Sequence, residues 1–428
     1  MTAISNTTLK QIIADQQHEK TIPEDYHIRT VESKFEDLAK NNEIIVLTGI
    51  RRCGKSVLLQ LFRTRTQDKD YYFNFEDERL ALFNKDDFQR LYEIFLEAFG
   101  EQKTFYFDEI QNIEGWEMFV RRLYNAGNKI YITGSNATLF SEELGTRLTG
   151  RFIKLTIYPF SFKESVEYEL PAVLTKKLLS TQDIGKIRSL FNIYCTFGGI
   201  PEYSRNRQVE YLHSLYESII YRDIVSRYKL TNVDALKKLI YFLSSNCSKE
   251  ITFGSLRKLL GLGSTTTVSD YCGYLESSYL CHFVNRYSHS VKTQQQSPKK
   301  VYFIDHALAK IVGFHFSEDT GRMLENIVYI ELKRRGNNIY YHKGTKECDF
   351  VIQKGTKIIE AIQVTQNLSG SDTRKREFDG LIEALEQYSL KHGLILTETD
   401  EGDETIEIDK KKYHLHIRPL WKWLLSLH

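Results

Sequence analysis

Eight consecutive residues near the beginning of the sequence have the types and spacing needed to hold phosphate. Residues 49–56 read Gly-Ile-Arg-Arg-Cys-Gly-Lys-Ser and match the pattern GxxxxGK[ST] completely. Glycines allow such a loop to curl so that its backbone N–H groups face an anion, and a helix that begins there adds a favourable dipole. In this pattern Lys55 contacts the β- and γ-phosphates of ATP, and the Ser56 hydroxyl binds Mg²⁺. The predicted ATP-binding residues are Gly49, Ile50, Arg51, Arg52, Cys53, Gly54, Lys55, Ser56 and Val57.

An apolar stretch that ends in two carboxylates supplies the second part of this site. Residues 104–107 read Thr-Phe-Tyr-Phe and are followed by Asp108 and Glu109. A strand with this ending places Asp108 at the carboxyl edge of a sheet beside the phosphate loop, where it can hold Mg²⁺. Glu109 is then positioned to activate the attacking water. Strands often end in acidic turns, so the pair is weak evidence alone and strong evidence together with residues 49–56.

The next predicted strand, residues 129–133, is followed shortly by Ser135 and Asn136. A polar side chain at this point can sense the γ-phosphate and align the water. Asn136 is the predicted catalytic residue, and Ser135 is the alternative. Both residues are equally suited to capping the helix predicted to follow, so a purely structural role stays open.

Two arginines, Arg147 and Arg151, precede a predicted fifth strand at residues 152–157. An arginine at this point can act in trans on the γ-phosphate held by a neighbouring subunit. Arg151 is the favoured candidate and Arg147 the alternative, and a surface or strand-capping role stays open for either. The predicted catalytic residues are therefore Lys55, Glu109, Asn136 and Arg151.

The elements that must position these residues follow from an alternation of short apolar runs and helical stretches. Such an alternation predicts an α/β fold with a parallel sheet that is covered by helices on both faces. Residues 1–40 are predicted to form polar helices that lead into the first strand. The predicted strands are residues 43–48, 70–75, 104–107, 129–133 and 152–157, and the predicted helices are residues 55–66, 88–99 and 116–126.

The composition is that of an ordinary soluble globular protein, long enough at 428 residues for two or three domains. Net charge is +2, so a nucleic-acid contact would need a local basic patch. The six cysteines form no CxxC pair and have no nearby His at ligand spacing, which argues against zinc and disulfides and favours a reducing cytoplasm. We find no signal-peptide core and no apolar run of bilayer length, so we expect a cytoplasmic protein without a membrane partner.

The second half of the sequence divides into a helical part and a mixed part. Helical patterns run from Pro159 to about residue 245, and residues 236–285 are predicted to form three helices and a pair of strands. Residues 288–300 are polar and are predicted to be a loop or wing. The final block is predicted to hold a helix at residues 323–334 and strands near residues 339–342, 349–352, 357–364 and 393–396.

Taken together, these motifs resemble those of the AAA+ ATPases, and specifically a prokaryotic branch that joins an ATPase core to a C-terminal domain of unknown function. The resemblance extends from about residue 20 to 425. It implies an ATPase core at 1–160, a helical lid at 161–235, a winged-helix segment at 236–298 and a restriction-endonuclease-like domain at 299–428. A nucleotide-sensing arginine of the lid is expected near residues 198–202. The resemblance is carried by residues 47–56, 72–77, 107–111, 132–135, 148–151, 159–164, 198–202, 301–305, 325–326 and 347–351.

The C-terminal block resembles restriction-endonuclease-like nucleases, but its motif is incomplete. Active members use a helix Glu, a strand Asp and Glu-x-Lys on the next strand to gather Mg²⁺ and position a water. Glu325 or Glu331 takes the first place and Asp349 the second. Gln363 and Thr365 stand where the last Glu and Lys are expected. The resemblance therefore implies the fold without the nuclease chemistry.

A DNA contact through residues 255–300 is a further hypothesis from the winged-helix resemblance. Residues 264–271 would open a recognition helix whose hydroxyls suit phosphate contacts. The alternative is a protein-contact module, because this helix is poor in Arg and Lys. Cations available to a DNA backbone are Arg257, Lys258, Lys292, Lys299 and Lys300.

The leading hypothesis is a homo-oligomeric, cytoplasmic ATPase that couples ATP binding and hydrolysis to assembly or to remodelling of a partner, either DNA or an unidentified protein. A slowly cycling nucleotide-gated switch or scaffold is the first alternative, and Glu109 argues for hydrolysis over a pure switch. A nucleic-acid-processing enzyme is the second alternative, and Gln363 and Thr365 argue against it.

Overall fold

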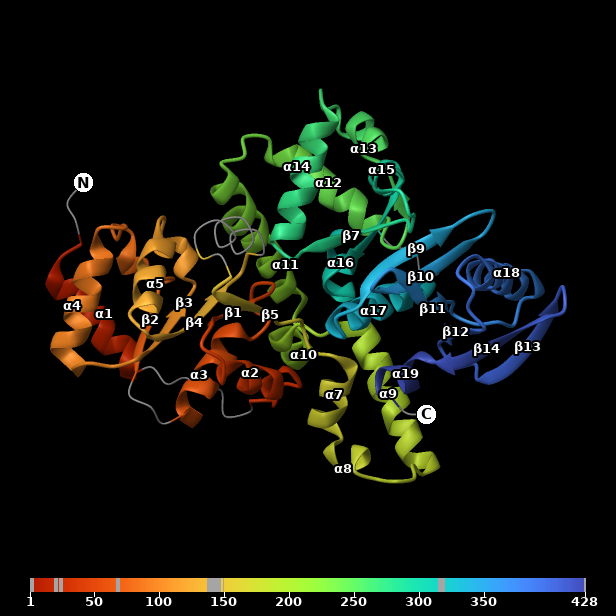
Figure 1. Cartoon of the computed structure of the whole chain (residues 1–428), viewed down its shortest axis with the longest axis horizontal. Coiled ribbons are helices and arrows are strands. Elements are labelled where there is room, and N and C mark those ends of the chain that lie inside the picture. Colours follow the sequence, from red (N-terminus) through yellow and green to blue (C-terminus); the bar gives the residue numbers. More distant parts are fainter. Residues whose placement is uncertain are drawn as a thin grey trace. The chain divides into compact units, whose positions relative to one another are not determined.

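The chain folds into two compact units in the computed structural model, which describes residues 4–18, 22, 26–66, 70–136, 148, 150–314 and 320–426. Unit 1 comprises residues 1–158 and 277–279, and unit 2 comprises residues 159–276 and 280–428 (Figure 1). The candidate Arg147 lies outside the described residues. Each unit has its own sheets and is considered by itself.

Unit 1 is built on one five-stranded sheet with the order β2-β3-β4-β1-β5. All four strand pairings are parallel, as predicted from the sequence. Its elements are α1 (Asn6–His18), α2 (Val31–Ala39), β1 (Ile44–Thr48), α3 (Lys55–Thr66), β2 (Tyr71–Asn74), η1 (Glu78–Leu80), α4 (Asp87–Phe99), β3 (Thr104–Asp108), η2 (Ile110–Asn112), α5 (Trp116–Asn125), β4 (Lys129–Gly134) and β5 (Phe152–Thr156).

The two faces of this sheet are buried by different helices, because side chains alternate along each strand. Phe105 and Phe107 of β3 belong to a core cluster that also takes residues from α1, α4 and α5. On the other face Tyr106 stacks on Tyr131 of β4, with ring centroids 4.8 Å apart. Phe62 of α3 packs against the same Tyr131 ring. The sheet is therefore covered on both sides, which explains the continuous apolar runs in its strands.

The strand order decides which loops meet at the functional edge. Strand β4 lies between β1 and β3. Since the three strands are parallel, the loop after Thr48, the end of β3 at Asp108 and the end of β4 at Gly134 lie at one edge of the sheet. This is the edge at which parallel α/β sheets bind ligands.

Unit 2 holds a helical segment and two further sheets. Its elements are α7 (Phe162–Glu169), α8 (Pro171–Leu174), α9 (Thr181–Phe197), α10 (Pro201–Asn206), α11 (Val209–Ser218), the π-helical η4 (Ile219–Ser226), α12 (Val233–Ser245), β6 (Glu250–Ile251), α13 (Phe253–Leu260), α14 (Thr265–Ser277), β7 (Cys281–Asn285), α15 (Val291–Gln296), β8 (Lys299–Phe303), α16 (His306–Val312), α17 (Thr320–Arg334), β9 (Asn338–Lys343), β10 (Glu347–Lys354), β11 (Lys357–Val364), α18 (Ser371–Gln387), β12 (His392–Thr397), β13 (Gly402–Ile408), β14 (Lys411–Pro419) and α19 (Leu420–Leu424).

The small sheet of unit 2 crosses the boundary that the sequence predicted between residues 298 and 299. Strand β8 pairs antiparallel with both β6 and β7. The predicted loop at residues 288–300 instead contains helix α15 and the start of β8. The structure therefore places the end of this sheet after Phe303.

The larger sheet has the order β13-β14-β12-β11-β10-β9 and mixes parallel and antiparallel pairs. The predicted strands near residues 339–342, 349–352, 357–364 and 393–396 correspond to β9, β10, β11 and β12. Helix α18 and the antiparallel pair β13 and β14 were not predicted. Helix α18 packs on β10, β11 and β12 and closes one face of the sheet (Figure 1).

A glycine turn in unit 2 wraps around a single carboxylate. Asp305 accepts a hydrogen bond from the backbone N–H of Gly199 at 2.7 Å and also caps α16 through two backbone N–H groups. A Cβ on Gly198 would lie 2.4 Å from an Asp305 oxygen, and one on Gly199 would lie 2.1 Å from the carbonyl oxygen of Phe160. The turn where a sensing arginine was expected therefore has a structural role of its own.

Gly199→Ala is expected to destabilise unit 2 by about 2–4 kcal/mol, because backbone atoms must move to admit the methyl group. The matched control is Gly254→Ala, since a Cβ at Gly254 meets nothing within 4 Å and alanine favours the helix α13 in which it lies. Denaturant unfolding measures both. Equal stability of the two variants would contradict the proposed crowding at Gly199.

Candidate nucleotide-binding site

The phosphate loop holds its lysine in place through its own carbonyl groups. Lys55 is buried at the start of α3, and its ammonium donates hydrogen bonds to the carbonyl oxygens of Gly49 and Ile50, both at 3.1 Å. The same ammonium lies 3.7 Å from an oxygen of Glu109. Lys55 is thereby pointed into the curve of the loop, where the sequence pattern predicts phosphate.

Close packing explains why the first residue of this loop is a glycine. Gly49 has a φ of +148°, and a Cβ there would lie 2.1 Å from the carbonyl oxygen of Ile157. Arg29 braces the loop from outside by donating to the carbonyl oxygens of Cys53 at 3.0 Å and Tyr158 at 2.7 Å. Burial raises the pKa of the Cys53 thiol, so this residue is a neutral packing group. Arg29 was not predicted as part of the site, because no motif in the polar residues 1–40 indicates that it contacts the phosphate loop.

The predicted magnesium ligands lie next to each other. The Ser56 hydroxyl donates to an Asp108 oxygen at 3.0 Å, and the Thr133 hydroxyl donates to the same oxygen. Tyr72 contacts the other Asp108 oxygen at 3.4 Å. Burial, together with the charge of Glu109, raises the pKa of Asp108 to about 6, although the hydroxyl donors oppose the shift. A buried carboxylate beside a hydroxyl is the hard oxygen donor set that suits Mg²⁺.

Glu109 is held by two residues for which the sequence suggested no role. Its backbone N–H donates to the Thr133 hydroxyl at 3.1 Å, and its carboxylate accepts a hydrogen bond from Gln111. Glu109 itself has a φ of +50°, in the left-handed region that non-glycine residues seldom adopt. Thr133, the residue before the last of β4, could have been predicted to contact Asp108. A strand that lies between β1 and β3 ends next to that carboxylate.

Ser135 and Asn136 lie at this edge as predicted. Both side chains are buried just beyond the end of β4. In the part of the chain that the structure describes, the Ser135 hydroxyl has no hydrogen-bond partner. Neither observation distinguishes the two as γ-phosphate sensors, so Asn136 stays the prediction and Ser135 the alternative.

Arg151 lies at the opposite edge of the sheet. It immediately precedes β5, and its carbonyl oxygen accepts a hydrogen bond from the N–H of Ile44 at 2.8 Å, where β1 begins. The phosphate loop follows the other end of β1, a strand length of roughly 15 Å away. Arg151 is therefore separated from the loop of its own chain, so the predicted catalytic role requires a second copy, and the surface or strand-capping role stays open.

Unit 2 contains a second group of buried charges, centred on Lys300. Its ammonium lies 3.0 Å from Glu325, 2.8 Å from Glu347 and 2.9 Å from Asp349. The Tyr302 hydroxyl also donates to Glu325, at 2.6 Å. Glu325 and Asp349 are thus brought together as predicted, and we call Glu325, Glu347 and Asp349 the carboxylate cluster.

Two predictions for this region fail. Lys300 was expected to offer charge to a DNA backbone, but its side chain is only 2% exposed and is enclosed by the carboxylate cluster. Glu331, the alternative to Glu325, pairs with Arg334 and Arg335 instead. The place of Lys300 in the carboxylate cluster was not predicted, because the lysine comes from β8, 49 residues before Asp349.

The positions expected to carry Glu-x-Lys have structural contacts. The Gln363 side chain accepts a hydrogen bond from the N–H of Asp349 at 3.2 Å and donates to Glu377. The Thr365 hydroxyl donates to the carbonyl oxygen of Asn367 at 3.3 Å. Among the described residues, no group of three or more His, Cys, Asp or Glu side chains is arranged to hold a metal ion.

Lys300→Met is expected to destabilise the protein by about 3–5 kcal/mol, because it leaves buried carboxylates without a counter-charge. Burial and Asp349 already raise the pKa of Glu325 to about 8, despite the ammonium. Without the ammonium the cluster binds protons in the folded state more tightly than in the unfolded state, so the loss should shrink as pH falls from about 8 to 5. Denaturant unfolding at both pH values measures this.

The matched control for this prediction is Lys299→Met. Lys299 is the preceding residue of β8; it hydrogen-bonds to the neutral Asn285 and interacts with one carboxylate, Glu276, rather than with a cluster of three. We expect a loss of no more than about 1 kcal/mol that depends less on pH over this range than the loss for Lys300→Met. A pH-independent loss for Lys300→Met would show that the cluster does not depend on its charge.

Comparison with known proteins places this geometry in a family. Residues 41–166 match the model of a family described as an AAA domain, and residues 188–317 and 320–419 match two families described as domains of unknown function. The uncharacterized protein MJ1544 of Methanocaldococcus jannaschii is 35% identical over 401 residues, which cover 90% of this chain and 89% of MJ1544. The chain belongs to the family of MJ1544. The stretch that matches the AAA-domain model contains the parallel sheet strands and the phosphate loop of unit 1.

Another relative in the MJ1544 family is an uncharacterized protein of Haemophilus influenzae. It is 31% identical over 368 residues, covering 82% of this chain and 88% of the relative. Among solved structures, the Walker-type ATPase PABY2304 of Pyrococcus abyssi aligns with 68% of this chain and 97% of its own, at 18% identity and a TM-score of 0.45. Within the described ranges, no helix has both the length and the apolar character required to cross a bilayer.

Proposed function

We propose that this chain is a Mg²⁺-dependent ATPase that couples its nucleotide state to assembly or to remodelling of a partner in the cytoplasm. One observation carries the proposal: Lys55, the pair formed by Ser56 and Asp108, and Glu109 meet at the carboxyl edge of the sheet. This combination supplies a phosphate cradle, a cation site and a base next to one another.

Each residue has a definite task in this proposal. Lys55 exchanges the carbonyl oxygens of its own loop for phosphate oxygens, while the N–H groups of residues 49–56 surround the anion. Ser56 and Asp108 hold Mg²⁺, which neutralises charge on the phosphoryl oxygens. Glu109 accepts a proton from the attacking water, and Asn136 or Ser135 senses the γ-phosphate.

Replacing Glu109 by Gln is expected to lower the ATP hydrolysis rate by about 100-fold or more, because the base is lost while the shape of the side chain is kept. Nucleotide binding should persist, since Lys55 and the loop are unchanged. The control is Glu114→Gln, an exposed position five residues along the chain. Release of phosphate and binding of a fluorescent ATP analogue are the two measurements.

Equal hydrolysis rates for the parent and Glu109→Gln would remove Glu109 from its proposed role. A parent that binds ATP but releases no phosphate would favour the slowly cycling switch or scaffold. The nuclease alternative is disfavoured by the cation of Lys300 within the carboxylate cluster and by the structural contacts of Gln363 and Thr365.

The position of Arg151 supports assembly into a homo-oligomer. A partly buried arginine at the amino edge of the sheet lies far from the loop of its own chain but can face the carboxyl edge of a second copy. In that arrangement its guanidinium stabilises charge on the γ-phosphate bound by the neighbour. The nucleotide site would then be completed only between subunits.

Arg151→Ala and Lys55→Ala are each expected to lose hydrolysis when they are assayed alone. Mixed in equal amounts, they should regain part of the parent rate, because an Arg151→Ala chain keeps its phosphate loop and receives the arginine of a Lys55→Ala neighbour. Phosphate release from the mixture measures the recovery. A mixture as inactive as its components, at concentrations where the parent is active, would oppose action in trans.

Residues 255–300 remain the proposed contact for DNA, if DNA is the partner. Lys258 and Lys292 are exposed on α13 and α15, and Arg257 is partly exposed. Lys300 contributes nothing to such a contact, because it is committed to the carboxylate cluster. A protein partner bound by the same segment is the alternative.

A further inference from the structure

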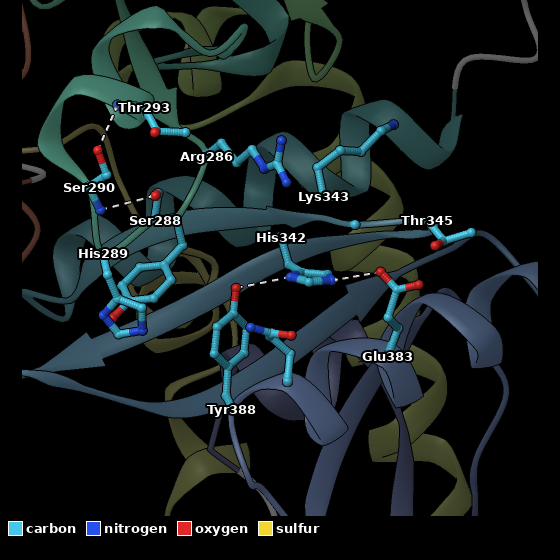
Figure 2. Close-up of a pocket in the computed structure, with 13 residues that line it drawn as sticks. Arg286, Ser288, His289, Ser290, Thr293, His342, Lys343, Thr345, Glu383 and Tyr388 are labelled. Carbon is cyan, nitrogen blue, oxygen red and sulfur yellow. Dashed lines mark hydrogen bonds and ion pairs between the residues drawn. The ribbon is translucent and has the colours of Figure 1, made fainter.

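Unit 2 contains a pocket that the nucleotide site does not use. Three segments line it: residues 286–293 from the end of β7 into the first turn of α15, residues 342–345 at the end of β9, and residues 383–388 at the end of α18. The cavity volume is about 670 Å³, and pockets for small ligands and cofactors commonly fall within about 300–1,000 Å³. Figure 2 shows side chains from all three segments converging on this space.

One wall of the pocket is fixed by a chain of hydrogen bonds. His342 contacts the Tyr388 hydroxyl at 2.9 Å and a Glu383 oxygen at 3.1 Å (Figure 2). The other Glu383 oxygen accepts a hydrogen bond from the N–H of Lys346 at 3.0 Å. A Cβ on Gly344 would lie 2.0 Å from a Glu383 oxygen, so a side chain at this position would displace the carboxylate. The carboxylate of Glu383 is therefore engaged within the wall.

The charge available to a ligand comes from Arg286. Lys343, the other cation that lines the pocket, is paired with Glu347 at 2.5 Å. Arg286 is half-buried, and among the described residues its guanidinium makes no hydrogen bond or ion pair. Burial lowers the pKa of His342, and Arg286 adds to this effect, so the imidazole is neutral near pH 7. A half-buried guanidinium without a carboxylate partner is a strong site for an anion.

Hydroxyl groups add further donors on the same side as Arg286. The Ser288 hydroxyl oxygen accepts from the N–H of Ser290 at 3.1 Å, and the Ser290 hydroxyl oxygen accepts from the N–H of Thr293 at 3.3 Å. Both bonds use oxygen lone pairs, so the hydroxyl protons stay available to a ligand. The Thr293 hydroxyl also lines the pocket. This wall thus offers a guanidinium and hydroxyl protons, the donors that recognise phosphate oxygens.

Aromatic rings accompany this donor wall. Tyr287 lies edge-on to Tyr388, with ring centroids 5.3 Å apart, and packs against His289 at 5.4 Å. His289 is exposed at the rim. A site with phosphate donors on one wall, the exposed imidazole ring of His289 at its rim and room for more than a phosphate matches the chemistry of a nucleotide.

We propose that this pocket binds the phosphate group of a nucleotide unit, with Arg286 as the paired cation and Ser288, Ser290 and Thr293 as hydroxyl donors. The unit is either a free nucleotide or part of a nucleic-acid strand. For the strand, the inference rests on the partner class proposed above for residues 255–300, and in neither case does it depend on ATP hydrolysis.

The test compares Arg286→Met with Lys354→Met in the full-length chain. Methionine keeps the apolar length of each side chain and removes its charge. Lys354 is an exposed cation at the end of β10, outside the pocket. One arm measures AMP binding by calorimetry in a Lys55→Ala background, which silences the phosphate loop. The other arm measures the fluorescence anisotropy of a labelled single-stranded oligonucleotide.

At least one probe is expected to bind the parent and to bind Arg286→Met about tenfold or more weakly, with Lys354→Met within about twofold of the parent. A loss for AMP alone assigns a free nucleotide, and a loss for the oligonucleotide alone assigns a strand. The proposal is overturned if neither probe binds the parent, if Arg286→Met has no effect, or if both variants weaken binding equally.

A second variant protects the test against a folding defect. Thr293→Val keeps the shape of its side chain and removes one hydroxyl donor, and it should weaken the same probe. Circular dichroism and thermal unfolding establish whether each variant is folded. Neither arm of the test measures phosphate release. A negative result in the binding experiments would therefore leave the ATPase proposal intact. If the protein proves inactive as an ATPase, the binding experiments can still be interpreted.

Discussion

The carboxylate of Asp108 is the group on which the nucleotide site depends, because three other elements contact it at once. Ser56 reaches it from α3, Thr133 from β4 and Tyr72 from β2. Burial raises its pKa to about 6, and the hydroxyl donors partly offset the cost of the charge. The strand order, with β4 between β1 and β3, makes this convergence possible. Thr133 also positions Glu109, because the Thr133 hydroxyl accepts a hydrogen bond from the Glu109 backbone N–H.

The phosphate loop is also packed directly against residues 157 and 158, where the chain leaves unit 1 for the first time. Gly49 admits the carbonyl oxygen of Ile157, whose N–H donates to Thr48 at 2.6 Å, and Arg29 holds the carbonyl oxygen of Tyr158. A change in the loop on phosphate binding would therefore act on the backbone that leads out of the domain. This contact gives the proposed coupling between nucleotide and partner a physical starting point within unit 1.

Local patterns allowed the sequence to predict the parallel sheet and most of its site. Residues 49–56 and Asp108 are recognisable because their function depends on neighbours in the chain or on the end of one strand. Lys300 and Arg286 were not recognisable as site residues, because their surroundings come from segments tens of residues away. Gly199 likewise gains its meaning only from Asp305, which lies 106 residues later. Helix α18 was predictable from its sequence, because Phe378, Leu381, Ile382 and Leu385 follow the i, i+3, i+4, i+7 spacing of a helix that buries one face.

The ammonium of Lys300 fills a carboxylate cluster in the part of the chain where the nuclease resemblance would place a divalent metal. An ion in solution binds by an equilibrium that depends on its concentration, whereas this charge is covalently attached and always present at one per site. Chelators and changes in metal supply therefore have no access to it. The charge balance at this cluster of the C-terminal sheet therefore does not depend on the concentration of metal ions, whereas the site in unit 1 would depend on it for Mg²⁺.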